Sequence, residues 1–158
     1  MRLGAEAVLT LHVSNRDAQP FDFSFAFHSY FAVADVRQTE VTGLEGAPYL
    51  DQLAPALGDQ QRAQTPIRFN AETDRIYQGG SGQYQIVQAG QATTQIDSAD
   101  CGSVIVWNPW TDKAARLGDM HPEAWPAMLC VECGQVGAHV VTVAAGASAA
   151  FSLRLGRV

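Results

Sequence analysis

Apolar and polar residues alternate along much of the chain with a period of two. In residues 8–13, VLTLHV, every second side chain falls on one face. Residues 21–28, FDFSFAFH, place four phenylalanines on one face and Asp22, Ser24 and His28 on the other. Strict alternation predicts strands with one face in a core and a different face outside it.

The same pattern recurs in short runs separated by Gly, Asp, Asn and Pro. These runs are DVRQTEV, TPIRFNA, DRIYQ, YQIVQAG, QATTQI, SVIVW, AMLCVE, AHVVTV and AAFSLRL. Many short strands with turn residues between them predict an all-β fold, an antiparallel sandwich or barrel. We predict a single β-sandwich domain over residues 1–158, whose open sheet edges a homo-oligomer or a longer parent protein would cover.

Helix is scarce in this pattern. The best candidate is residues 111–119, TDKAARLGD, with Thr111 or Asp112 as N-cap and Gly118 near the C-terminal end. Residues 49–59, YLDQLAPALGD, are predicted to form an irregular loop.

Composition and charge narrow the possible partners. The chain has 158 residues, of which 47% are hydrophobic and 16% charged, as in a soluble globular protein. The net charge is −6 and the ten Lys and Arg residues are scattered, which argues against nucleic acid or an anionic membrane as partner. No apolar run predicts a transmembrane helix or a signal peptide, and three cysteines form no disulfide framework. These features predict a cytoplasmic protein.

His28 is the first candidate for chemistry. It falls opposite the phenylalanine face, in line with Asp22 and Ser24. A polar row in so aromatic a strand fits a ligand-facing sheet surface. The alternative is a structural histidine bonded to a neighbouring backbone group.

Glu132 is the second candidate, within the apolar stretch PAMLCVECGQV. Alternation places it on one face with Met128 and Cys130, and Leu129, Val131 and Cys133 on the other. Burial disfavours the charged form of a carboxylate, so its pKa rises, which suits a general base near neutral pH. The alternative is a carboxylate paired with a structural cation.

The two cysteines of this stretch, Cys130 and Cys133, have C-x-x-C spacing. On a strand they point to opposite faces, and no second C-x-x-C or H-x₃₋₅-H pair accompanies them. We therefore predict no metal site from this pair.

Asp74 lies in AETDRIYQGG, on one strand face with Glu72 and opposite Arg75. This pattern fits either a sugar-binding carboxylate or an exposed, charged strand start. Further along, Trp107 and Trp110 flank an Asn-Pro pair, and tryptophans either stack on sugar rings or fill cores. The chain has neither a G-x-x-x-x-G-K phosphate loop nor a G-x-S-x-G elbow.

Taken together, four segments resemble the hexose-6-phosphate mutarotases, the glucose-6-phosphate 1-epimerase branch of the aldose 1-epimerase superfamily. In chain order they are FAFHSYFAVADVRQTEVTGLEGAPYLDQL, ETDRIYQ, VIVWNPWTDKAARLGDM and AMLCVECGQV. The resemblance spans nearly the whole chain but matches only the C-terminal part of these usually longer proteins. It therefore implies a fold that is incomplete at the N-terminus, without the family's arginine phosphate clamps, for which Arg75 or Arg116 are possible substitutes.

The resemblance implies a galactose-mutarotase-like β-supersandwich and assigns roles to three residues. His28 matches the general acid that protonates the ring oxygen, and Glu132 matches the base that removes the anomeric hydroxyl proton. Asp74 matches a carboxylate that hydrogen-bonds sugar hydroxyls. The expected substrate is a sugar or sugar phosphate held between acid and base, and no metal or organic cofactor is implied.

Two other functions fit parts of the pattern. One is a non-catalytic carbohydrate-binding or regulatory module built on an epimerase remnant. The other is a glycoside hydrolase that uses Asp74 and Glu132 as its carboxylate pair, which leaves His28 without a role.

Overall fold

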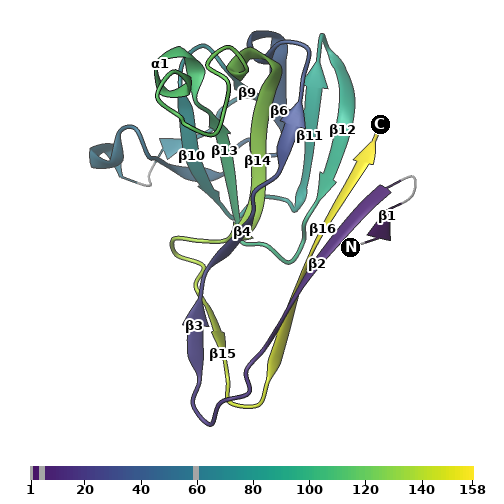
Figure 1. Ribbon diagram of the computed structural model, residues 1–158, viewed down its shortest axis with the longest axis vertical. Coiled ribbons are helices and arrows are strands. Elements are labelled where there is room, and N and C mark those ends of the chain that lie inside the picture. The colour runs from purple at the N-terminus through teal and green to yellow at the C-terminus, as the bar shows by residue number, and fades with distance from the viewer. Residues whose placement is uncertain (1, 4–5, 59–60) are drawn as a thin grey trace.

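Two antiparallel sheets packed face to face make up most of the computed structural model, which describes residues 2–3, 6–58 and 61–158 (Figure 1). We call the first one the back sheet. Its strands, in spatial order, are β1 (Arg2–Leu3), β2 (Glu6–Ser14), β16 (Ser148–Arg157), β12 (Gln91–Asp97), β11 (Gln83–Gln88), β6 (Thr39–Thr42) and β9 (Ile67–Arg68).

The second sheet carries the candidate site, and we call it the site sheet. Its order is β4 (Phe25–Phe27), β14 (Met128–Gln135), β13 (Ser103–Asn108), β10 (Thr73–Gln78), β7 (Pro48–Asp51) and β8 (Gln61–Arg62). A further strand, β5 (Tyr30–Ala32), also pairs with β14. All the described pairings are antiparallel, so the all-β prediction is confirmed.

The core lies between the two sheets, and alternation decides which side chains enter it. Leu129, Val131 and Cys133 of β14 are fully buried there, as their shared face predicted. They pack in one cluster with buried residues of the neighbouring strands and of the back sheet, including Val41, Ile67, Tyr77, Tyr84, Ile86, Ile96, Val104, Val106 and Leu153. Met128, Cys130 and Glu132 therefore face the other side of the site sheet.

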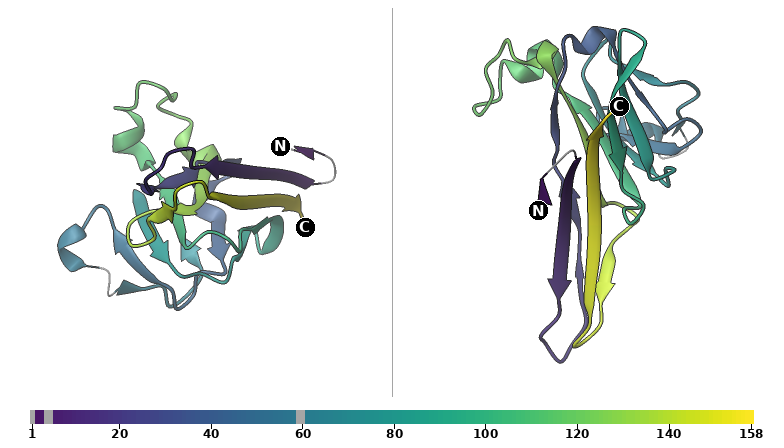
Figure 2. Two further views of the ribbon diagram at one scale, coloured as in Figure 1. Left: turned by 90° about the horizontal axis from the view of Figure 1, so that it is seen from below. Right: turned by 90° about the vertical axis from the view of Figure 1, so that its right-hand side faces the viewer.

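A long arm extends from the sandwich. β2 and β16 run side by side to its far end, where β3 (Phe21–Phe23) pairs with β15 (Val141–Val143) (Figures 1 and 2). The single strand predicted over 21–28 is therefore wrong, because the chain changes partner at Ser24, from β15 to β14. The phenylalanines still form one row, with successive ring centroids 5.9, 6.0 and 5.5 Å apart.

The helical elements are short. They are α1 (Trp110–Ala114) and the 3-10 turns η1 (Val36–Gln38), η2 (Pro55–Leu57) and η3 (Trp125–Ala127). Across the described residues, no helix has the length and apolar character needed to span a membrane. The loop predicted over 49–59 is wrong in part, since β7 and η2 occupy much of it; residue 59 lies outside the described part of the chain.

The predicted helix over 111–119 is also shorter than expected and starts earlier. The Thr111 hydroxyl bonds to the carboxylate of Asp112 at 3.1 Å rather than capping the backbone. The turn is set instead by Asn108, which is fully buried. Its Oδ1 accepts from the Trp110 backbone N–H at 2.9 Å, and Trp110 has a left-handed φ of 55°, which is costly for a non-glycine residue.

Asn108 also forms hydrogen bonds with the C-terminal end of residues 109–128. Its Nδ2 donates to the backbone oxygens of Trp125, at 2.9 Å, and of Met128, at 2.8 Å. One side chain thus closes residues 109–128 into a loop above the site sheet, with the rings of Trp110 and Trp125 packed 4.3 Å apart.

We expect Asn108→Ala to lower the free energy of unfolding by about 3 kcal/mol, because it leaves two carbonyls and one N–H without their partner. Urea unfolding followed by tryptophan fluorescence measures the change. The exposed Asn70→Ala is the matched control and should stay within about 0.5 kcal/mol of the wild type. Equal stability of the two variants would contradict the assigned role of Asn108.

Candidate active site

The register of β14 brings His28 and Glu132 together. Phe27 lies opposite Cys133 in the β4 pairing, and Tyr30 lies opposite Cys130 in the β5 pairing. The same register therefore continues across the gap between β4 and β5, and it places His28 opposite Glu132. The backbone turns sharply there, with the Ser29 N–H donating to the Phe27 oxygen at 2.8 Å, so His28 protrudes from the sheet.

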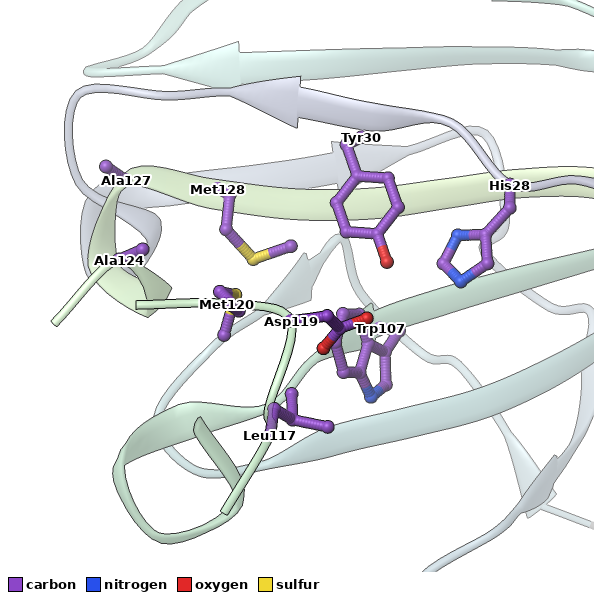
Figure 3. Close-up of a pocket in the computed structure, with 9 residues that line it drawn as sticks. All are labelled: His28, Tyr30, Trp107, Leu117, Asp119, Met120, Ala124, Ala127 and Met128. Carbon is purple, nitrogen blue, oxygen red and sulfur yellow. The ribbon is translucent and has the colours of Figure 1, made fainter. Parts of the chain in front are cut away.

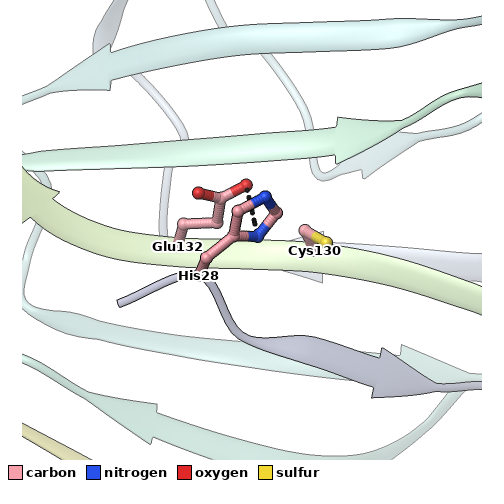
Figure 4. A group of neighbouring side chains, drawn as sticks. All are labelled: His28, Cys130 and Glu132. Atoms are coloured by element: carbon pink, nitrogen blue, oxygen red, sulfur yellow. Dashed lines mark ion pairs between the residues drawn. The ribbon is translucent and has the colours of Figure 1, made fainter. Parts of the chain in front are cut away.

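The two side chains touch. His28 Nδ1 lies 3.2 Å from Glu132 Oε1 (Figure 4). The His28 side chain is 53% exposed, whereas that of Glu132 is 10% exposed. The pair therefore consists of a solvent-exposed imidazole in contact with a largely buried carboxylate. This differs from the expectation of two groups on opposite sides of a sugar, because opposed positions of one register are direct neighbours.

The surroundings of Glu132 make it a better base. Burial, and secondly the negative charge of Asp74, raise the pKa of Glu132 to about 7. A carboxylate with such a pKa can exchange a proton near neutral pH, whereas an ordinary one near ~4.3 is a weak base.

Asp74 lies on the same face of the site sheet. Cross-strand pairing places Tyr30, Cys130, Trp107 and Asp74 in one row across four strands. Burial raises the pKa of Asp74, an effect that the charge of Lys113 opposes. The structure thus brings Asp74 within electrostatic reach of Glu132, with β13 between their strands.

A cavity of about 730 Å³ opens beside His28 (Figure 3). The loop closed by Asn108 forms one wall of it, with Leu117, Asp119 and Met120 across from Tyr30 and Met128. Its lining residues are His28, Tyr30, Trp107, Leu117, Asp119, Met120, Ala124, Ala127 and Met128. Apolar walls with a few polar groups at one end are typical of small-molecule sites.

Two aromatic rings position the imidazole. Tyr30 stacks on His28 with centroids 4.7 Å apart and 11° between planes. Trp107 meets His28 edge-on at 6.3 Å and 86°. Tyr30 and Asp119 were not predicted as site residues. The H-S-Y spacing was the available signal for Tyr30, because i and i+2 share a strand face, whereas nothing local marked Asp119.

The cysteines separate as the alternation predicted. Cys133 is buried in the core, and Cys130 lies on the face of Glu132. The ligand atoms of His28, Cys130 and Glu132 all lie within 4.8 Å of one another. This is the one group of at least three potential metal ligands found among the described residues.

Comparison with known proteins identifies the family. The family described as aldose 1-epimerase matches residues 1–156. The chain belongs to the aldose 1-epimerase family.

Two curated relatives narrow the comparison, and both are named "Putative glucose-6-phosphate 1-epimerase". The protein from Cenchrus ciliaris is 32% identical over 120 residues, which cover 75% of this chain and 36% of the relative. The protein from Haemophilus influenzae is 26% identical over 132 residues, which cover 82% of this chain and 45% of the relative. The chain thus spans less than half the length of either relative.

Solved structures agree on the fold. A Salmonella typhimurium protein described as a "putative mutarotase" superposes with a TM-score of 0.82 at 21% identity, covering 98% of this chain and 50% of that one. A galactose mutarotase related enzyme from Lactobacillus acidophilus gives a TM-score of 0.73 at 10% identity, covering 99% of this chain and 59% of that one. The fold is therefore galactose-mutarotase-like.

Neither of the two candidate phosphate-binding arginines, Arg75 and Arg116, lines the cavity beside His28. Arg75 points to the opposite face of β10 from Asp74, where its Nε lies 3.2 Å from Asp51 Oδ2 and its guanidinium covers the Tyr49 ring. Arg116 is exposed just beyond α1. Arg75 is thus engaged in a structural ion pair.

The raised pKa of Glu132 predicts how stability depends on pH. The folded chain binds the Glu132 proton more tightly than the unfolded chain, so it loses stability as pH rises from about 4.5 to about 7. Glu132→Gln lacks this loss. Its free energy of unfolding should therefore rise relative to the wild type between about pH 4.5 and pH 7, by up to roughly 3 kcal/mol.

Urea unfolding across this pH range measures the difference, with the exposed Glu123→Gln as matched control. The control should show no such trend. A constant difference between Glu132→Gln and the wild type would contradict the raised pKa.

Proposed function

We propose that this chain interconverts the α and β anomers of an aldohexose 6-phosphate, with His28 as general acid and Glu132 as general base. The contact between the exposed imidazole and the buried carboxylate carries the proposal. Ring opening of a cyclic aldose needs one proton removed from the anomeric hydroxyl and one delivered to the ring oxygen. This pair supplies both functions in the proposed reaction, and His28 also lines the cavity.

The proton balance closes over one turnover. Glu132 takes the anomeric hydroxyl proton while His28, as imidazolium, protonates the ring oxygen, and the bond between C1 and that oxygen breaks. Rotation about the C1–C2 bond presents the other face of the aldehyde. On closure the hydroxyl formed from the former ring oxygen attacks C1 and returns its proton to His28. Glu132 returns its proton to the anomeric oxygen.

The contact of acid and base suits this chemistry. The anomeric oxygen and the ring oxygen are both bonded to C1, so the two reacting oxygens are neighbours. Neighbouring acid and base groups can therefore serve them from one side. His28 faces Glu132 through Nδ1, which leaves Nε2 as the nitrogen that delivers the proton in the proposed reaction.

Two further observations support the substrate class. In the proposed complex Asp74 accepts hydrogen bonds from sugar hydroxyls and keeps the pKa of Glu132 high by its charge. Both curated relatives carry a glucose-6-phosphate 1-epimerase name, which supports a hexose 6-phosphate as substrate.

Exchange NMR of glucose 6-phosphate tests the proposal. We expect the protein to accelerate transfer of magnetisation between the anomeric protons, and Glu132→Gln and His28→Asn each to lower the rate at least about 100-fold. Glu123→Gln, an exposed glutamate just outside the site, should retain the wild-type rate. Glucose under the same conditions tests the preference for the 6-phosphate.

An unchanged exchange rate at saturating wild-type protein would contradict the proposal. Because the chain spans less than half of its curated relatives, a non-catalytic sugar-binding module is the competing function. It predicts a sugar-dependent change in tryptophan fluorescence without anomer exchange, and equal binding by Glu132→Gln.

A further inference from the structure

The site face of β14 offers a second kind of chemistry. We propose that His28, Cys130 and Glu132 bind a zinc ion as a three-ligand site with one open position, and that the bound ion inhibits the chain. The site differs from the C-x-x-C pair, since Cys133 faces the core and the third ligand comes from the turn between β4 and β5.

The distances suit tetrahedral zinc. With Zn–N and Zn–O near 2.0–2.1 Å, tetrahedral N and O ligands lie about 3.3 Å apart, and sulfur lies about 3.5 Å from either. His28 Nδ1 and Glu132 Oε1 are already 3.2 Å apart, longer than the ~2.7–2.9 Å of a charge-assisted hydrogen bond. One ligand atom from each of His28, Cys130 and Glu132 lies within 4.8 Å of the other two, so the Cys130 sulfur must close by about 1.3 Å at most.

The strand fixes the positions of Cys130 and Glu132, whereas the half-exposed His28 side chain can move toward them. Cys130 and Glu132 are i and i+2 on β14, so the strand holds both on one face. His28 is half-exposed and can adjust its ring toward them. His28 also lines the cavity, so a water or another small ligand can reach the fourth position from that side.

Ligand type and charge select the ion. A thiolate and an imidazole favour zinc-class ions over Mg²⁺ and Ca²⁺, which prefer oxygen ligands. Asp74 and Asp119 add negative charge on the same side of the sheet, and Lys113 is paired with Glu72 at 3.6 Å. Binding releases the Cys130 thiol proton to solvent. The metal–sulfur bond must offset the free energy that this deprotonation costs.

Inhibition follows from the shared atoms. A bound ion takes the Nδ1 lone pair of His28, so the imidazolium that acts as the acid cannot form. It also takes the Glu132 oxygen that faces His28, so the carboxylate loses its role as the base. Only this consequence rests on the proposed epimerase function; metal binding itself rests on the geometry of the three side chains.

Titration with Co²⁺ as a spectroscopic probe tests the site. We expect one Co²⁺ per chain, a thiolate-to-cobalt charge-transfer band in the near ultraviolet, and displacement of Co²⁺ by Zn²⁺ but not by Mg²⁺. Cys130→Ser should abolish the band and weaken binding at least 10-fold, whereas Cys133→Ser, the matched core cysteine, should keep both. Absence of the band in the wild type, or its survival in Cys130→Ser, would overturn the proposal.

A second pair of variants covers the case in which a buried cysteine replacement does not fold. His28→Ala removes an exposed ligand and should weaken Co²⁺ binding at least 10-fold, while the exposed His12→Ala on β2 should not. Equal binding by these two variants would equally overturn the site. Cobalt binding without anomer exchange would leave the site standing and refute the proposed function, and exchange that saturating Zn²⁺ leaves unchanged would refute the inhibition.

Discussion

The candidate site depends on one interaction, the contact between the buried carboxylate of Glu132 and the exposed imidazole of His28. The backbone of Glu132 is held in place, because the alternate residues of its strand pack in the core. Its charge is costly there, which is why its pKa rises to about 7. His28 reaches it because β4 and β5 pair with β14 in one continuous register and leave a two-residue turn between them.

The rest of the fold supports that contact from two sides. The back sheet and the core fix the site sheet, so that rows of side chains such as Tyr30, Cys130 and Trp107 lie at set positions. Above the sheet, Asn108 closes the loop that forms the outer wall of the cavity. A single buried amide therefore holds both ends of a loop that lines the cavity beside His28, although it takes no part in the proposed chemistry.

Much of this was predictable from local pattern. Period-two alternation correctly predicted the two faces of β14, because strand geometry assigns faces without knowledge of partners. The apolar neighbours of Glu132 in the sequence predicted its burial, which raises its pKa. The contact between His28 and Glu132 was not predictable in this way, since it depends on register between distant segments. The partner change at Ser24 and the early start of α1 have the same origin. Each follows from a tertiary contact, the pairing with β15 and the hydrogen bonds of Asn108, that local propensity does not contain.

The proposed catalysis depends on the pKa of Glu132. The loss of folding stability as Glu132 ionises depends on the same pKa. The most direct measurement is a titration of the glutamate side-chain carboxyl signals by ¹³C NMR, with the Glu132 signal assigned by its loss in Glu132→Gln. The account predicts a midpoint at about 7 for Glu132, with the exposed Glu123 serving as internal reference. A Glu132 midpoint near the ordinary value of ~4.3 would contradict it.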